Sequence, residues 1–111
     1  MGVLIEGHPV PAYNGVYRVE SEHEGWPVLK NDKGEHGAYF YRAEGGFWRL
    51  KYGLNVEDGV PDFRADGPHN ASIYAPEGRF PVGEHTWECW VFFGLERDFE
   101  WHPLTLTVTL Q

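Results

Sequence analysis

Acidic and histidine side chains gather in one glycine- and proline-rich stretch, and their types are those that bind metal ions. Asp62, Asp66 and His69 lie close together, and Asn70 follows directly. Their oxygens and imidazole could hold Ca²⁺ or Zn²⁺, but the spacing matches no EF-hand loop or short zinc motif. Asp and Asn also cap turns with their own side chains. Turn formation is therefore the favoured interpretation; these residues stay as less favoured metal candidates, and we expect no cofactor.

Residues suited to nucleophilic catalysis are few. Serine occurs only at positions 21 and 72, and neither lies in a Gly-x-Ser-x-Gly turn. The single cysteine, Cys89, lies between Trp87 and Trp90, where a buried thiol is unreactive. The 17 acidic residues always offer carboxylate pairs, so a small hydrolase stays as a less favoured alternative. We expect a protein that is not an enzyme.

Aromatic residues are the type in surplus, with five Trp, six Tyr and seven Phe. A chain of 111 residues cannot bury all of them, and exposed flat rings stack on sugars or anchor protein interfaces. Strand alternation favours a core position for Trp48 and Trp87. Trp26 precedes a proline and lies near the acidic residues 20, 22 and 24, which favours an exposed position. Core packing is the competing interpretation of each ring. The ligand-binding candidates are Trp26, Tyr39, Tyr41, Trp48 and Trp101.

The formal net charge is −8, and most of it comes from the second half of the chain. Such a chain repels a phosphate backbone, and the sequence has no basic run, so nucleic acid is not an expected partner. Its field suits cations or a basic protein surface. With one cysteine there is no internal disulfide, and no signal peptide or membrane-spanning stretch is found. A cytoplasmic location is favoured, or an extracellular one if this is an excised domain of a secreted chain.

The elements that must position these side chains are short strands, because 14 Gly and 8 Pro interrupt the chain throughout. Alternation is clearest at 104–110, where Leu and Val face one side and Thr the other. Segments 38–42 and 47–52, joined by a Gly-Gly turn, predict a hairpin. Further strands are expected at 3–6, 15–20, 26–31, 71–75 and 86–93.

Two segments carry special expectations. Residues 54–80 form a long irregular segment within a single domain spanning 1–111, and loops of that length are often functional. Segment 86–93 is apolar on both faces, which predicts a central strand covered on both sides. The pattern as a whole predicts an all-β fold, a small antiparallel β-sandwich or barrel of about eight short strands.

Several segments of the chain follow one pattern: Gly15-Val16-Tyr17, 25–31, 38–42 and 47–50, and later Pro81-Val82-Gly83 ahead of Trp87. With these segments, the first half of the chain resembles aromatic-rich β-modules of large multidomain proteins from algae and other protists. The resemblance implies a β fold with a binding or spacer role, and it assigns no functional residues. The chain departs from that pattern at Leu29, where tyrosine is expected, and in the insertion 54–80.

The leading functional hypothesis is a non-catalytic binding module that binds carbohydrate through exposed aromatic residues. The alternative is a protein-protein interaction or assembly module of a larger protein. Carbohydrate or a protein or peptide is therefore the expected partner, with no nucleic acid and no membrane, and the oligomeric state stays open.

Overall fold

A computed structural model describes residues 1–33, 37–52, 61–75, 80–91 and 99–111. These residues form eight strands and one short 3-10 turn, which confirms the predicted all-β fold. The elements are β1 (Gly2–Glu6), η1 (Pro11–Tyr13), β2 (Gly15–His23), β3 (Trp26–Asn31), β4 (Tyr39–Ala43), β5 (Phe47–Lys51), β6 (Ala71–Tyr74), β7 (Gly83–Val91) and β8 (Glu100–Leu110).

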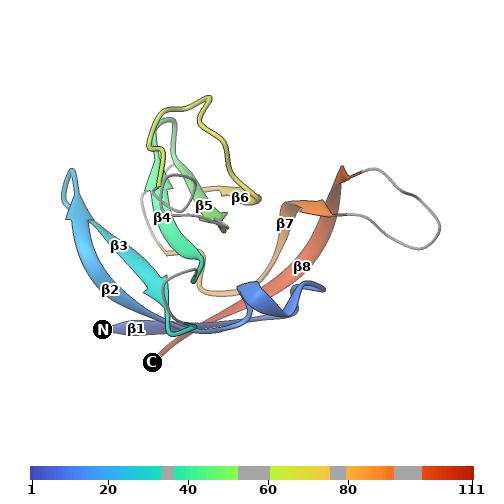
Figure 1. Cartoon of the computed structure of the whole chain (residues 1–111), viewed down its shortest axis with the longest axis horizontal. Helices are drawn as coiled ribbons and strands as arrows, with labels where there is room; N and C mark the ends of the chain where they lie inside the picture. Colours follow the sequence, from blue (N-terminus) through green and yellow to red (C-terminus); the bar gives the residue numbers. More distant parts are fainter. Residues whose placement is uncertain (34–36, 53–60, 76–79, 92–98) are drawn as a thin grey trace.

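The eight strands form a closed antiparallel barrel, which decides between the two predicted architectures. Each strand pairs with the next one in sequence, and β8 pairs back with β1 from Val3 opposite Leu110 to Glu6 opposite Thr107. The two ends of the chain therefore lie side by side (Figure 1). Closure gives every described strand a partner on both sides along part of its length.

The predicted hairpin at 38–42 and 47–52 is confirmed as β4 and β5, with Ala43 opposite Phe47. Gly45 and Gly46 have φ angles of +85° and +84°, a conformation that favours glycine, so this dipeptide forms the turn. The last strand begins earlier than predicted, at Glu100. Pro103 is tolerated because β1 pairs only with residues 107–110, so β8 has one neighbour at the proline.

Inward-facing aromatic residues fill the barrel, as alternation along each strand requires. Trp48 and Trp87 are fully buried. Phe40 makes edge-on contacts with both indoles, at ring-centroid distances of 5.1 and 6.0 Å, and with Tyr17 and Phe80. Edge-on aromatic pairs are worth about 1 kcal/mol each beyond their burial. The barrel interior therefore holds a packed aromatic core.

A second, smaller cluster lies on the outside of the barrel. Val28, Tyr41 and Ala43 point outward from β3 and β4, and the ring of Phe63 packs on them. We call residues 61–70 the outer arch. Arg49 on β5 fixes the outer arch to the barrel wall. Its guanidinium donates hydrogen bonds to the carbonyl oxygens of residues 64 and 65 at 2.9 and 2.6 Å.

Candidate functional site

Two tryptophans face outward from neighbouring strands and lie directly opposite each other. Trp90 on β7 pairs with Trp101 on β8, with ring centroids 5.2 Å apart and planes tilted by 58°. Their exposed fractions are 39% and 44%. Alternation explains both positions, since Trp87, Cys89 and Val91 take the inward places on β7. Two indole faces are thereby presented to solvent on one patch of the barrel wall.

Two further rings extend this patch. Phe99 stacks on Trp90 with planes 15° apart and is itself half exposed. The imidazole of His69 lies against Trp101, at 5.1 Å between centroids. We call the side chains of His69, Trp90, Phe99 and Trp101 the aromatic platform. Exposed aromatic side chains that lie together on a surface are candidates for ligand and protein contacts.

The end of the outer arch supplies the polar rim of the platform. Asn70 is fixed from three directions: its N–H donates to Leu50 O, its carbonyl accepts from the Trp90 N–H, and its Oδ1 accepts from the Tyr52 N–H, each at 2.8 Å. Because Oδ1 accepts that bond, the amide NH2 is the remaining donor of the side chain. The arch is thus anchored to both β5 and β7 at this point.

His69 is held in one orientation and in its neutral form. Its Nδ1 lies 2.9 Å from the carbonyl oxygen of Gly67, so Nδ1 carries the proton and Nε2 is an acceptor. Burial lowers the pKa of His69, which favours the neutral ring at pH 7. Together with Gly67, Pro68, Asn70 and the two tryptophans, it lines a shallow hollow of about 300 Å³.

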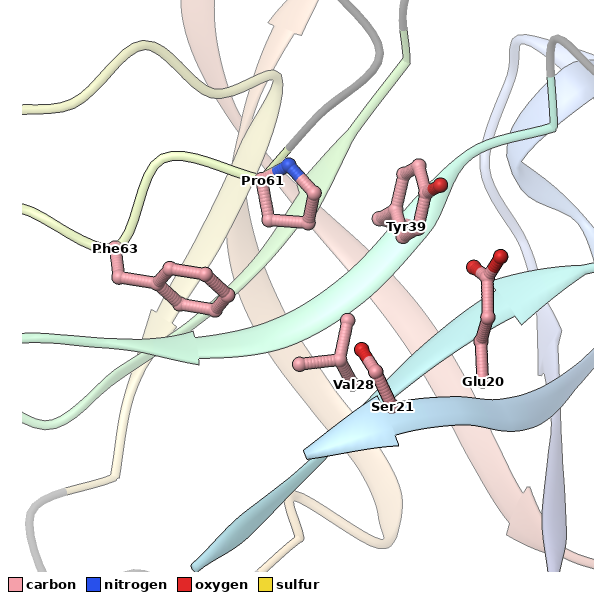
Figure 2. A pocket seen from close by; sticks show the side chains of 6 residues that line it. All are labelled: Glu20, Ser21, Val28, Tyr39, Pro61 and Phe63. Carbon is pink, nitrogen blue, oxygen red and sulfur yellow. The ribbon is translucent and has the colours of Figure 1, made fainter. Parts of the chain in front are cut away.

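A second hollow, which we call the outer cleft, lies between the other end of the arch and the sheet. Its volume is about 440 Å³. Figure 2 shows Phe63 and Pro61 on one side of it, Tyr39 and Glu20 on the other, and Val28 with Ser21 on the strands between. Apolar side chains on one side and on the floor of the cleft therefore face a carboxylate and two hydroxyl groups.

A β-bulge positions the carboxylate of the outer cleft. Val19 pairs with Leu29 and Ser21 with Val28, so Glu20 is the extra residue on β2. A bulge turns a side chain away from the regular alternation. Burial raises the pKa of Tyr39, and the charge of Glu20 and its hydrogen bond with Tyr39 raise it further.

The five aromatic residues predicted to bind a ligand do not meet at one place. Trp48 and Tyr41 are fully buried, so neither reaches a surface ligand. Trp48 faces the core, as its strand pattern favoured, and Tyr41 is covered by Phe63 of the arch. Trp26 is partly buried against Trp48, and the Arg42 guanidinium lies 4.6 Å from its ring. Tyr39 lines the outer cleft, and Trp101 lies in the platform.

Sequence reasoning missed Trp90, which is the counterpart of Trp101. The expectation that segment 86–93 is covered on both sides is wrong for Trp90, which lies on the outer wall of the barrel and is exposed. Residues 92 and 93 lie outside the described part of the chain. The available signal was alternation, which opposes Trp90 to Trp87 and Cys89 on the same strand.

Each of the three metal candidates has different surroundings in the structure. Arg64 donates to both carboxylate oxygens of Asp62, at 2.6 to 3.2 Å, and holds its pKa at about 2. Asp66 is exposed, and His69 packs on Trp101. Over the described ranges, no group of three acidic, His or Cys side chains is arranged to hold a metal ion.

Cys89 lies inside the barrel, fully buried in the core. Burial raises the pKa of its thiol to about 12, so the sulfur stays protonated at neutral pH.

No family model, curated protein or solved structure matches the chain. Among the residues that the structure describes, no helix has the length and apolar character needed to cross a membrane.

Proposed function

We propose that this chain is a non-catalytic binding module whose aromatic platform binds carbohydrate. The observation that carries the proposal is the pair of opposed, outward-facing indoles of Trp90 and Trp101, both more than a third exposed. Leaving such rings in water forgoes about 25 cal/mol for each Å² of apolar surface that burial would remove. A ligand with a flat apolar face recovers this free energy by stacking on them.

The rim next to the indoles has the groups that sugar hydroxyls need. His69 offers Nε2 as an acceptor, and the Asn70 amide offers a donor, each fixed by a hydrogen bond on its other polar atom. A few fixed polar groups beside aromatic surfaces are typical of small-ligand sites. A sugar ring, with C–H groups on its face and hydroxyls at its edge, matches this arrangement.

A protein partner is the second candidate function, and Phe99 is the observation that favours it. Its ring continues the platform beyond Trp90 and is half exposed. A row of aromatic residues wider than one sugar ring is also the composition of an interface hot spot. Such a partner would cover Phe99, Trp90 and Trp101 together.

A glycan array followed by tryptophan fluorescence titration tests the carbohydrate proposal. Trp101→Ala and Trp90→Ala are each expected to weaken sugar binding about tenfold or more, because each removes a stacking face. Tyr74→Ala is the matched control, since Tyr74 is an exposed ring that contacts Phe47 on β5, outside the platform. If no sugar binds the wild-type chain, the carbohydrate proposal fails; a Trp101-dependent self-association or partner complex in light scattering would then support the interface.

A further inference from the structure

We propose that the outer cleft is a second binding site, independent of the aromatic platform, that takes the side chain of a lysine from a basic protein segment. Two observations lead to it: an acceptor-rich lining and apolar side chains against which a flexible alkyl chain can pack.

The polar groups of the cleft are of one kind. The residues that line it provide one carboxylate, from Glu20, and two hydroxyls, from Ser21 and Tyr39, and none of the lining side chains is cationic. Within the described part of the chain, no Lys, Arg or His nitrogen lies within ion-pair distance of the Glu20 carboxylate. The Glu20 carboxylate has a neutral hydrogen-bond partner in Tyr39. An ammonium group would add a counter-charge and three donors for these oxygens.

The apolar groups of the cleft suit the stem of a lysine. Val28 is buried and forms the floor, and Pro61 and Phe63 of the arch form one wall (Figure 2). A lysine stem packs on apolar surface while its charged head reaches polar groups. The aromatic ring of Tyr39 adds attraction for a cation near its face.

The ring of Tyr39 already has a cation close to it, which supports this chemistry. The Lys30 ammonium lies 5.5 Å from the centre of the Tyr39 ring, and Lys51 is the residue opposite Tyr39 on the neighbouring strand β5. Neither lysine lines the cleft. Both are like charges toward an incoming ammonium, so removing Lys30 should favour the ligand whereas removing Glu20 should oppose it.

The long-range charge of the protein favours the same partner. The formal net charge is −8, and the arm formed by β2 and β3 carries Glu22 and Glu24 beyond the bulge. Such a field attracts basic segments and raises their association rate at low salt.

The test uses Nα-acetyl-lysine methylamide as the probe and the norleucine analogue, which lacks the ammonium, as its control. Amide chemical-shift changes in two-dimensional NMR are expected at Ser21, Val28 and Tyr39 with the lysine probe and not with norleucine. Glu20→Gln should weaken binding about tenfold, and Lys30→Gln should tighten it by about twofold. Both changes are at the surface and leave the core intact.

Three outcomes would overturn the proposal: equal shifts with norleucine, no shifts with either probe, or reversed effects of the two substitutions. Equal shifts would mean an apolar groove, and reversed effects would mean that the Glu20 carboxylate does not attract the ammonium group. Trp101→Ala serves as the cross-control and should leave the lysine-induced shifts unchanged. Failure of sugar binding at the platform is therefore distinguishable from failure of lysine binding at the outer cleft.

Discussion

Strand β7 carries one tryptophan on each face of the barrel wall, and the two have opposite surroundings. Trp87 is fully buried among inward-facing rings, while Trp90, three residues later, is 39% exposed beside Trp101. The same residue type on the same strand thus packs in the core on one side and stays open to solvent on the other. Which of the two applies is decided by strand alternation and by what covers the outer face.

The largest expected effect separates these two tryptophans. Trp87→Ala removes the whole indole from a packed core and should lower the free energy of unfolding by about 3–5 kcal/mol. Trp90→Ala, the matched outer substitution, should change it by less than about 0.5 kcal/mol. Urea unfolding followed by circular dichroism measures both. Similar losses for the two variants would mean that the platform is part of the core.

The contrast between buried and exposed positions also applies to a titratable group, the imidazole of His8. His8 is almost fully buried, with its ring against Tyr13 and its Nδ1 accepting the Val10 N–H, and burial lowers its pKa to about 4. His8 becomes protonated near pH 6.5 in the unfolded chain but only near pH 4 in the folded chain. Stability should therefore fall as the pH drops from about 6.5 to about 4, by on the order of 3 kcal/mol, and this contribution should change little below that.

The measurement for His8 is the urea midpoint as a function of pH, with His8→Asn as the control. Asn keeps an acceptor near the Val10 N–H and does not titrate. The variant should lose most of the slope between pH 4 and 6.5. An unchanged slope would assign the acid sensitivity to other groups.

The smallest of the three expected losses of stability concerns the outer face of the barrel, where Arg49 is covered by the arch and Arg64 is exposed. Arg49→Met removes the two hydrogen bonds that hold the arch over Tyr41 and should cost about 2 kcal/mol. It should also speed proteolysis within residues 61–66. Arg64→Met is the control, because Arg64 is exposed and pairs only with Asp62 among the described carboxylates, so its loss should cost less than about 0.5 kcal/mol. Equal protease sensitivity of the two variants would contradict a holding role for Arg49.

Local sequence patterns predicted most of the strands. They did not predict how the strands close into a barrel, which depends on tertiary contacts. Alternation and a Gly-Gly turn were enough for β4, β5 and residues 104–110 of β8. Barrel closure was not predictable in this way, because it depends on Val3 meeting Leu110, residues far apart in the chain. A sandwich and a barrel share the same local strand pattern.

The candidate site was predicted only in part, for a related reason. Trp101 was one of the five ligand-binding candidates, and it lies in the platform. Tyr41 was assigned to the surface, and it is outward-facing, but Phe63 of the arch covers it. Trp90 was missed because its strand is apolar on both faces, so period alone did not reveal which face is uncovered. The alternation of residues along a strand does not show whether a segment distant in sequence covers its outer face.

The pairing of the first strand with the last has a kinetic consequence. Every other strand contact joins sequence neighbours, and these hairpins can form locally. The β1–β8 ladder needs residues 3–6 to meet residues 107–110, and the loop entropy of that step is paid before its hydrogen bonds form. During synthesis β1 therefore waits unpaired on one side until β8 has left the ribosome. Folding to the closed barrel becomes a late, single event, and the interval before it is when the chain is most exposed to aggregation.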